Sequence, residues 1–443
     1  MQDATDSGYV LVAPQDSTYT YLIDQDTGAV AHAWKSAHTA GLAATLTDDG
    51  HLFRAGKVGD EHMLHGAGGV IEEYDWDGNL VWQYYDAGDR EFQHHDFTIL
   101  PNGNVLYIAA ELIPAAEAVA LGRDPGELRD GMLMADKLVE VMPVGATGGV
   151  VVWEWRAIDH VIQDRDPTKA NYGDVAAHPE RIDFNYQGRP LFPDGWTHIN
   201  GVDYDAATDT VLVSVRNYNE LWAVDHGTTT AQAAGPAGDL LWRFGNPQAS
   251  RAGDASDQVL FGQHDAKWID DGLPGAGHIL VFDNGVDRLA GSFSRVLEID
   301  MSGAATARPG QADRNAAIVW SYVAPMPMDM FSAKMSGAQR LPDGDTLVTV
   351  GDTGNIFEIS PDGDTRWSYD TDLLLLEGSS ARREGSVFYA TWYGADDPAL
   401  ACRNLEGENP AMGMTARLSA NALTDALDRL RITGAAPLLA PRA

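Results

Sequence analysis

Residues 196–216 read WTHINGVDYDAATDTVLVSVR, and this stretch predicts a β-hairpin. Two apolar runs flank the turn-rich DAATDT, and the second run, Thr210 to Val215, is rich in β-branched residues. Such runs, bounded by Asp, Thr and Gly, are typical of paired strands. Because a hairpin folds the chain back on itself, His198 at its start and Arg216 at its end are expected to be neighbours. An imidazole beside a fixed cation suits an anionic substrate, whereas the alternative is two surface side chains that never meet.

Short strands that end at a tryptophan recur along the chain outside this hairpin. They read GAVAHAW, GNLVW, GVVVW, GDLLW, AAIVW and GDTRW, and they end at the tryptophans numbered 34, 82, 153, 242, 320 and 367. Most of them follow another strand, such as YTYLID or RVLEID, and before that a hairpin with a polar turn, such as TILPNGNVLYI. Four short strands per unit, in six matched units, predict an all-β fold, a six-bladed β-propeller. A large β-sandwich is the alternative, which the matched units disfavour.

The two ends of the repeat indicate how the ring closes. Gly8 to Ala13 resembles the second strand of the first blade with no strand before it, and Gly385 to Tyr393 is a strand left over after the sixth unit. We therefore predict that the late strand supplies the missing inner strand of blade one, which protects sheet edges that would otherwise be open.

The remaining segments lie outside the repeat pattern. The propeller is expected to occupy residues 1–402, and residues 403–443 a C-terminal helix and tail, with Ala416 to Leu430 as the helix. Residues 112–136 are rich in Ala, Glu and Leu and are expected to be helical. Residues 157–194 are polar and loop-like, which suits either a lid over a site or a decoration of the fold.

Composition excludes some partners. The chain has 443 residues, with 30 Lys and Arg against 65 Asp and Glu, a net charge of −35. So acidic a chain is not expected to bind nucleic acid, although a local group of Arg and His can reverse the field in one cleft. No apolar run approaches the roughly 20 residues of a membrane span, so no membrane partner is expected. The oligomeric state is open between a monomer and a homodimer.

The sequence gives only weak indications of the cellular compartment. The single cysteine, Cys402, cannot form an intrachain disulfide. The start, MQDATDSG, has neither a basic region nor an apolar run, so no signal peptide is visible. We expect a periplasmic or extracellular protein, with a cytoplasmic one as the alternative.

Histidines recur at the start of the units. Innermost strands of a propeller face a central channel, so equivalent positions form a ring at one mouth, and a functional site is expected there. The chain has no GxSxG, P-loop or strand–helix GxGxxG signature, so a serine hydrolase or a nucleotide enzyme has little support. The unit openings are HTAGLAATL from His38, HHDFTIL from His94 and His95, HINGV from His198, HDAKW from His264 and SGAQR from Ser336.

Several motifs carry a family resemblance. They are WTHINGVDYD with the following SVR, QHDAKW with HILVFDNG, HDFTILPNGN, SGAQRLPDGDTL and FYATWYGADDPAL, and they span roughly residues 38 to 400. Their order and spacing are similar to those of the bacterial aryl sulfotransferases that work without a nucleotide sulfate donor. The resemblance implies a six-bladed propeller that moves a sulfuryl group from an aryl sulfate to a phenol by a ping-pong reaction, with small-molecule partners and neither cofactor nor metal.

The resemblance also implies roles for individual residues. His264 would be the nucleophile that carries the sulfuryl group as a sulfohistidine. His95, His198 and Arg216 would bind the sulfuryl oxygens and assist the departing phenol. Further substrate contacts are expected from His38, His94 and Asn200, and from the aromatic residues Trp196, Tyr218, Phe331 and Tyr393, for which core packing is the alternative.

Three other functions compete with this hypothesis. A lyase acting on an acidic saccharide would use a histidine base, Tyr218 or Tyr393 as acid and Arg216 against a carboxylate. A ring of histidines could hold Zn²⁺ or Cu²⁺, although Arg216 would repel the ion. A non-catalytic scaffold needs no such cluster.

Overall fold

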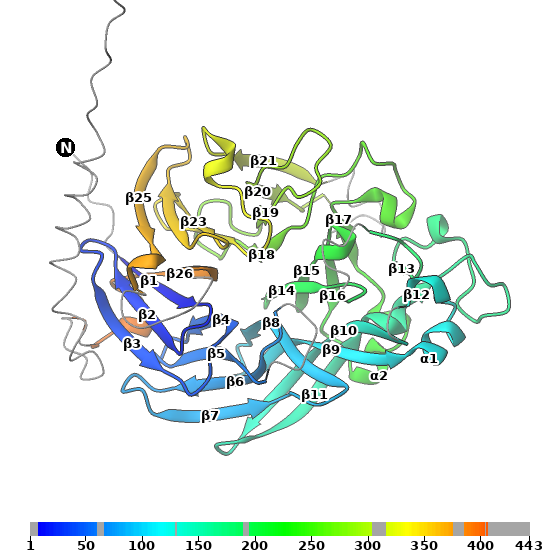
Figure 1. Ribbon diagram of the computed structural model, residues 1–443, viewed down its shortest axis with the longest axis horizontal. Helices are drawn as coiled ribbons and strands as arrows, with labels where there is room; N and C mark the ends of the chain where they lie inside the picture. Colours follow the sequence, from blue (N-terminus) through cyan, green and yellow to red (C-terminus); the bar gives the residue numbers. More distant parts are fainter. Residues whose placement is uncertain are drawn as a thin grey trace, which may run out of the picture.

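Six four-stranded antiparallel sheets stand in a ring around a central axis in the described part of the chain (Figure 1). The computed structural model describes residues 8–59, 66–128, 131–188, 195–303, 316–374, 385–403 and 405. The ring confirms the predicted all-β, six-bladed propeller, and each of the six predicted tryptophans lies on the outermost strand of its blade. The predicted helix at Ala416 to Leu430 lies outside the described residues.

Each blade is described here from its innermost to its outermost strand. Blade one consists of β26 (Val387–Gly394), β1 (Gly8–Pro14), β2 (Tyr19–Asp24) and β3 (Val30–Lys35). Blade two consists of β4 (Ala40–Leu46), β5 (Leu52–Lys57), β6 (Gly69–Tyr74) and β7 (Leu80–Tyr85). Blade three consists of β8 (Glu91–Ile99), β9 (Val105–Pro114), β10 (Met132–Val144) and β11 (Gly148–Arg156).

The second half of the ring repeats this order. Blade four consists of β14 (Ile199–Asp205), β15 (Thr210–Val215), β16 (Glu220–Asp225) and β17 (Trp242–Phe244). Blade five consists of β18 (His264–Trp268), β19 (Ile279–Asp283), β20 (Arg295–Asp300) and β21 (Ala317–Tyr322). Blade six consists of β22 (Gly337–Arg340), β23 (Thr346–Val350), β24 (Asn355–Ile359) and β25 (Thr365–Asp370).

Five of the six repeated tryptophans donate a hydrogen bond to the next blade. The indole of Trp34 in blade one donates to the carbonyl of Asp75 at 3.0 Å, where blade two turns. Trp82 of blade two donates in the same way to Gly148 of blade three at 2.8 Å. Such bonds satisfy the indole N–H where the rest of the ring is apolar, which explains why one tryptophan per unit marks the repeat. The other three such bonds run from Trp153 to Thr228, from Trp320 to Pro361 and from Trp367 to Gln25.

Blade one is closed by the two ends of the chain. Strand β26 pairs antiparallel with β1, from Gly8 opposite Gly394 to Pro14 opposite Val387. The late strand is therefore the innermost strand of the first blade, as predicted. In Figure 1 this blade, blue with one orange strand, joins the start of the described chain to its end.

The segment expected to be helical forms only one short helix and is strand at both of its ends. Within residues 112–136, β9 continues to Pro114 and β10 begins at Met132, and between them lie the short helix α1 (Ala115–Ala120) and a 3₁₀ turn. Ten residue pairs join β9 to β10, and the partners along that ladder outweigh the helical propensity of an Ala- and Glu-rich segment.

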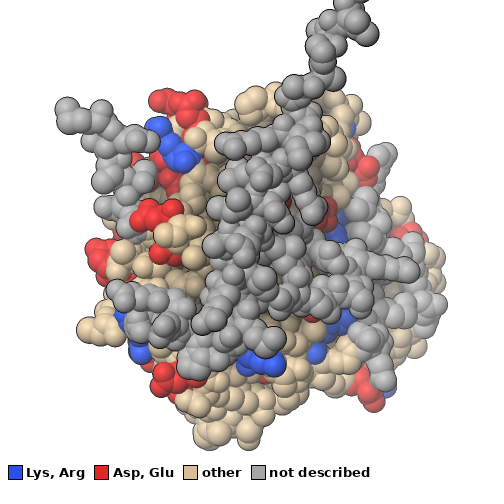
Figure 2. All heavy atoms as spheres, turned by 60° about the vertical axis from the view of Figure 1, so that its left-hand side comes forward, with Lys and Arg blue, Asp and Glu red and all other residues tan. Residues whose placement is uncertain are grey.

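The segment 157–194 is irregular in its described part, as expected. It holds only 3₁₀ turns and the two-residue strands β12 (Val161–Ile162) and β13 (Ile182–Asp183), which pair in parallel. Within blade four, a second short helix, α2 (Thr230–Ala233), lies between β16 and β17. Among the described residues, no helix has the length and apolar character needed to span a membrane. Acidic side chains form several separate groups on the described surface of the face shown in Figure 2, with basic side chains between them.

Candidate active site

The predicted histidines lie where innermost strands begin at one end of the channel. His95 lies in β8, His198 directly precedes β14, and His264 opens β18. The backbone takes a positive φ of 53° at both His95 and His198, and of 50° at Asp265. The register of each strand shifts nearby. A side chain at positive φ costs of order 1–3 kcal/mol, and bulges of this kind re-aim side chains next to functional sites.

Three histidines and Arg216 form one buried cluster. The ring centroids of His95 and His198 lie 4.9 Å apart. The backbone N–H of Arg216 donates to the carbonyl of His198 at 3.1 Å, so the hairpin brings these two residues together as predicted. His264 is close enough to Arg216 and His198 for both to act on its pKa. None of the four side chains is more than 4% exposed.

The orientation of the His264 ring is fixed by Asn284, which follows β19. The amide nitrogen of Asn284 donates to the carbonyls of Ser332 and Met335, at 2.9 and 3.0 Å. Its Oδ1 must therefore be the acceptor that lies 2.8 Å from Nδ1 of His264. Nδ1 of His264 then carries the proton, as its second contact with the carbonyl of Gly262 also requires, and Nε2 carries the lone pair. Sequence reasoning missed Asn284, although it lies within the HILVFDNG motif.

The charges in the cluster follow from burial. Burial, and then the nearby Arg216, lowers the pKa of His264 to about 3. Burial also lowers the pKa of Arg216 to about 10, against the opposing effect of Asp287. Burial and the neighbouring rings hold the pKa of His95 well below its ordinary 6.5. At neutral pH the cluster therefore sets a neutral, nucleophilic imidazole beside a charged guanidinium.

His94 lies behind His95 rather than at the substrate side. It is fully buried, with its Nδ1 2.7 Å from Nδ1 of His95 and its Nε2 3.2 Å from Oδ1 of Asp136. The other carboxylate oxygen of Asp136 accepts from the backbone N–H of Ile199 at 2.7 Å and from the hydroxyl of Thr197. Asp136 was missed because its segment was expected to be helical, whereas it lies on β10.

Two of the predicted aromatic contacts belong to the core. The indole of Trp196 donates to the phenol oxygen of Tyr218 at 2.8 Å, and that phenol donates to the carbonyl of Asp183 at 2.9 Å. Both side chains pack in a core cluster between blades three and four. The structure thus gives them packing partners, which is the alternative that the sequence left open.

The other four predicted substrate contacts lie in different environments. His38 is tied to its own blade, with Nδ1 2.9 Å from a carboxylate oxygen of Glu72. The phenol oxygen of Tyr393 accepts from the backbone N–H of Leu46 at 2.8 Å, and Phe331 is half-buried just after a 3₁₀ turn. Asn200 is near the site, because its amide donates at 2.9 Å to the carbonyl of the residue before His264. Its Oδ1 is buried and has no hydrogen-bond partner among the described residues.

A charged group that sequence reasoning missed follows the histidines along the channel. Nζ of Lys267 lies 2.8 Å from Oδ1 of Asp265 and 3.7 Å from the ring centroid of Tyr389. The phenol of Tyr389 donates to Asp96 at 3.0 Å, and the same carboxyl accepts from the backbone N–H of Val202. Burial raises the pKa of Asp96 to about 7, with Lys267 opposing. The carboxylates that follow His95 and His264 therefore point away from the histidines and share one lysine.

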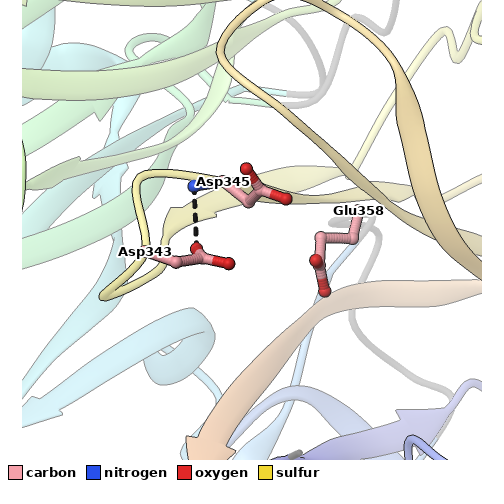
Figure 3. A group of neighbouring side chains, drawn as sticks. All are labelled: Asp343, Asp345 and Glu358. Atoms are coloured by element: carbon pink, nitrogen blue, oxygen red, sulfur yellow. Dashed lines mark hydrogen bonds between the residues drawn. The ribbon is translucent and has the colours of Figure 1, made fainter. Parts of the chain in front are cut away.

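A separate acidic group lies on blade six. Asp343, Asp345 and Glu358 are the described residues whose ligand atoms are close enough together to hold a metal ion (Figure 3). Glu358 already accepts from the amide of Gln25 at 2.5 Å, and Asp345 lies 3.6 Å from Nε of Arg366. The group repeats a contact of other blades, where the corresponding Glu is paired with a donor. These pairs are His51 with Glu73, Asn104 with Glu140 and His278 with Glu298.

Solved structures of several propeller-like proteins overlap most of this chain at low identity. A protein of unknown function from Bacteroides caccae is 12% identical with a TM-score of 0.48, over 87% of this chain and 98% of that one. A periplasmic gluconolactonase from Pseudomonas aeruginosa is 12% identical with a TM-score of 0.42, over 87% and 99%. A virginiamycin B lyase from Staphylococcus aureus is 10% identical with a TM-score of 0.39, over 83% and 85%. Likenesses this weak carry no functional argument.

Sequence comparison is more informative. The curated proteins include no significant match to this chain. The family model described as Arylsulfotransferase (ASST) matches residues 10–364, which include the hairpin, all four histidine-bearing blade openings and Arg216. The chain therefore belongs to the arylsulfotransferase (ASST) family, a family of transferases.

Proposed function

We propose that this protein transfers a sulfuryl group from an aryl sulfate to a phenol, with His264 as the covalent carrier. The observation that supports this most strongly is the bond between Nδ1 of His264 and Asn284, which leaves the lone pair on Nε2. The pKa of His264, lowered to about 3, keeps this ring neutral at physiological pH. An activated nucleophile next to a cation is the arrangement that covalent transfer of an anionic group needs.

The reaction proceeds in two half-reactions. In the first, Nε2 of His264 attacks the sulfur of the donor, the bond from sulfur to the aryl oxygen breaks, and that oxygen leaves with the electron pair. In the second, the oxygen of an acceptor phenol attacks the same sulfur while its proton passes to a neutral imidazole of the cluster, and the S–N bond returns its electron pair to Nε2. Because the acceptor enters after the first phenol has left, the kinetics are ping-pong.

The cationic side of the cluster stabilises the transferring group. Arg216 keeps its charge, since its pKa of about 10 is well above neutral pH, and its planar fork suits the oxygens of a sulfuryl group. Its backbone bond to His198 holds the two residues on one side of the cluster. Asn200, fixed to the residue before His264, supplies an amide nearby. As in phosphoryl transfer, positioning and charge stabilisation carry most of the catalysis.

The lyase alternative is not favoured. It needs the phenol of Tyr218 or Tyr393 as a general acid at the site. Tyr218 is committed to Asp183 and Trp196 in the core, and Tyr393 to Leu46 between blades one and two. For the location of the protein, membership of the family supports a periplasmic or extracellular one.

The decisive experiment is incubation with 4-nitrophenyl sulfate in the absence of an acceptor, followed by the intact mass. We expect a gain of one sulfuryl group, with release of one equivalent of nitrophenol. His264→Asn should form no adduct, whereas His226→Asn, which removes a histidine paired with Glu140 and Asp209, should form it normally. An unmodified wild-type protein that also releases no phenol when acceptors are added would refute sulfuryl transfer.

A further inference from the structure

The buried pair of His94 and Asp136 has no part in the reaction described so far. His94 contacts Asp136 through Nε2, at 3.2 Å, and His95 through Nδ1, at 2.7 Å. Both side chains are almost wholly buried, at 0% and 1% exposure. Asp136, His94 and His95 thus contact one another in sequence. The last of them belongs to the cluster, with its ring centroid 4.9 Å from that of His198. An ionised carboxylate that is buried this deeply is costly unless it is paired, and the question is what its pair with His94 does.

The first half-reaction needs a proton donor, which gives this pair a role. The departing aryl oxygen needs a proton whenever its phenol is weakly acidic, as an unsubstituted phenol is, with a pKa of about 10. His95 is the histidine whose ring lies between the pair and the site, but burial and the surrounding His198, His94, His264 and Arg216 hold its pKa well below 6.5. His95 is therefore neutral and cannot hold a spare proton on its own.

We propose that Asp136, His94 and His95 form a proton relay in which the spare proton is stored on His94, against Asp136, and is delivered through His95. The inference rests on the proposed function, and it makes His94 and Asp136 positioning residues that act through His95. The contact of Nδ1 with Nδ1 supports it, because two facing ring nitrogens at 2.7 Å must share one proton.

The relay has two states that differ by one proton. In the loaded state, His94 is an imidazolium whose Nε2–H forms an ion pair with Asp136 at 3.2 Å and whose Nδ1 donates to His95, so His95 carries its own proton on Nε2. When the aryl oxygen leaves, His95 gives it the Nε2 proton and takes the Nδ1 proton of His94. In the unloaded state both rings are neutral, and Nε2 of His95 is a base that accepts the proton of the acceptor phenol, which reverses each transfer.

The neighbouring charges, against the effect of burial, favour this placement of the positive charge. Asp136 keeps its carboxylate form because His94, Thr197 and the N–H of Ile199 hold its pKa below the ordinary value, against the effect of burial. The positive charge of the loaded state is therefore next to a fixed negative charge, and it stays one ring away from Arg216. Storage on His95 itself would set two cations side by side.

A series of donors tests the relay. We would measure the first-turnover release of phenol from 4-nitrophenyl, 4-chlorophenyl and unsubstituted phenyl sulfate by stopped flow. General acid catalysis contributes about 10²–10⁴-fold, so His94→Gln should lose about 10²–10³-fold with phenyl sulfate and little with the nitrophenyl donor, whose phenolate leaves without help. Asp136→Asn should show the same pattern, because an amide at this place holds His94 in a neutral form with no spare proton.

The relay is refuted if the loss of rate does not depend on the donor. Equal losses for all donors would mean that His94 only shapes the site, and no loss with phenyl sulfate would mean that the proton comes from elsewhere. His226→Gln, which removes a histidine paired with Glu140 and Asp209, is the matched control and should leave all donors unaffected.

A second measurement does not depend on activity. With ¹⁵N-labelled histidine, NMR near neutral pH should show, besides the signal of His226 with its raised pKa, a ring protonated on both nitrogens that is absent in His94→Gln and in Asp136→Asn. Neutral rings for both His94 and His95 in the wild-type protein would refute the relay even if the variants fail to fold. A wild-type protein that transfers no sulfuryl group refutes the proposed function, whereas transfer with uncharged rings refutes the relay alone.

Discussion

Replacing Asp345 by Asn is expected to stabilise the protein above neutral pH. Asp345 faces Glu358 (Figure 3), at a position where Asn104 of blade three donates to its glutamate. Burial, with the carboxylates of Asp343 and Asp345, raises the pKa of Glu358 from an ordinary 4.5 to about 7. A carboxyl whose pKa is raised on folding contributes stability below its unfolded pKa and loses that contribution as the pH rises through its folded pKa. The wild-type protein therefore loses stability between about pH 4.5 and 7.

The size of the effect follows from the same values. The difference between 4.5 and about 7, at about 1.4 kcal/mol per pKa unit, sets an upper bound near 3 kcal/mol. Burial is the largest cause of the shift and is unchanged in the variant, so Asp345→Asn recovers only part of this bound. The lost ion pair between Asp345 and Arg366 costs at most about 1 kcal/mol, since Arg366 is 52% exposed. We expect Asp345→Asn to gain about 1 kcal/mol above pH 7 and nothing near pH 5.

The assay is urea unfolding of both proteins at several pH values, followed by tryptophan fluorescence. Asp362→Asn is the matched control, because Asp362 is an exposed carboxylate of the same blade and is not among the charges that raise the pKa of Glu358; it should gain nothing. Asp343→Asn removes the other of those charges and should gain as Asp345→Asn does. Parallel curves of stability against pH for the wild-type protein and Asp345→Asn would refute the reasoning, because Glu358 would then titrate without regard to Asp345.

Three further predictions concern the active site. Asn284→Ala frees the ring of His264 to take the unreactive tautomer, so we expect adduct formation to slow by about 10²-fold or more, as measured by intact mass against time; an unchanged rate would show that Asn284 does not select the tautomer. Arg216→Lys keeps the charge but loses the planar fork, and a loss of about 10²–10³-fold in kcat/KM with 4-nitrophenyl sulfate is expected, with wild-type kinetics as the contrary result. Because the pKa of His264 is lowered to about 3, stopped-flow adduct formation from the nitrophenyl donor should be constant between about pH 5 and 8. A fall centred near the ordinary 6.5 would contradict it.

Much of the fold could be predicted because the same residue type recurs wherever the same structural role recurs. Each outer-strand tryptophan needs an apolar place and an acceptor for its N–H, and the next blade supplies both, as Trp34 and Trp82 show. The pairing of His198 with Arg216 could also be predicted, since two strands joined by a short turn must return to the same end. The segment around α1 could not, because its composition favours a helix and only the long ladder with β10 overrides that preference.

The site was predictable in outline but not in its roles. Equivalent blade positions identified His95, His198 and His264, yet the same argument included His38, whose partner Glu72 lies on its own blade. Asn284 and Asp136 act through contacts between residues far apart in sequence, with Ser332 and Met335 in one case and Thr197 in the other. Nothing in the local pattern of a strand reveals such contacts, so their roles needed the structure.

The closure of blade one has a consequence for folding during synthesis. Strand β1 leaves the ribosome before every other described strand, but its partner β26 leaves after them all. At about 5–20 residues per second, the apolar edge GYVLVAP waits tens of seconds for its cover, and an uncovered edge of this kind recruits other chains. A nascent chain halted before Val387 would carry five complete blades and one open edge, so the synthesis of β26 is the step that separates a closed ring from an aggregation-prone one.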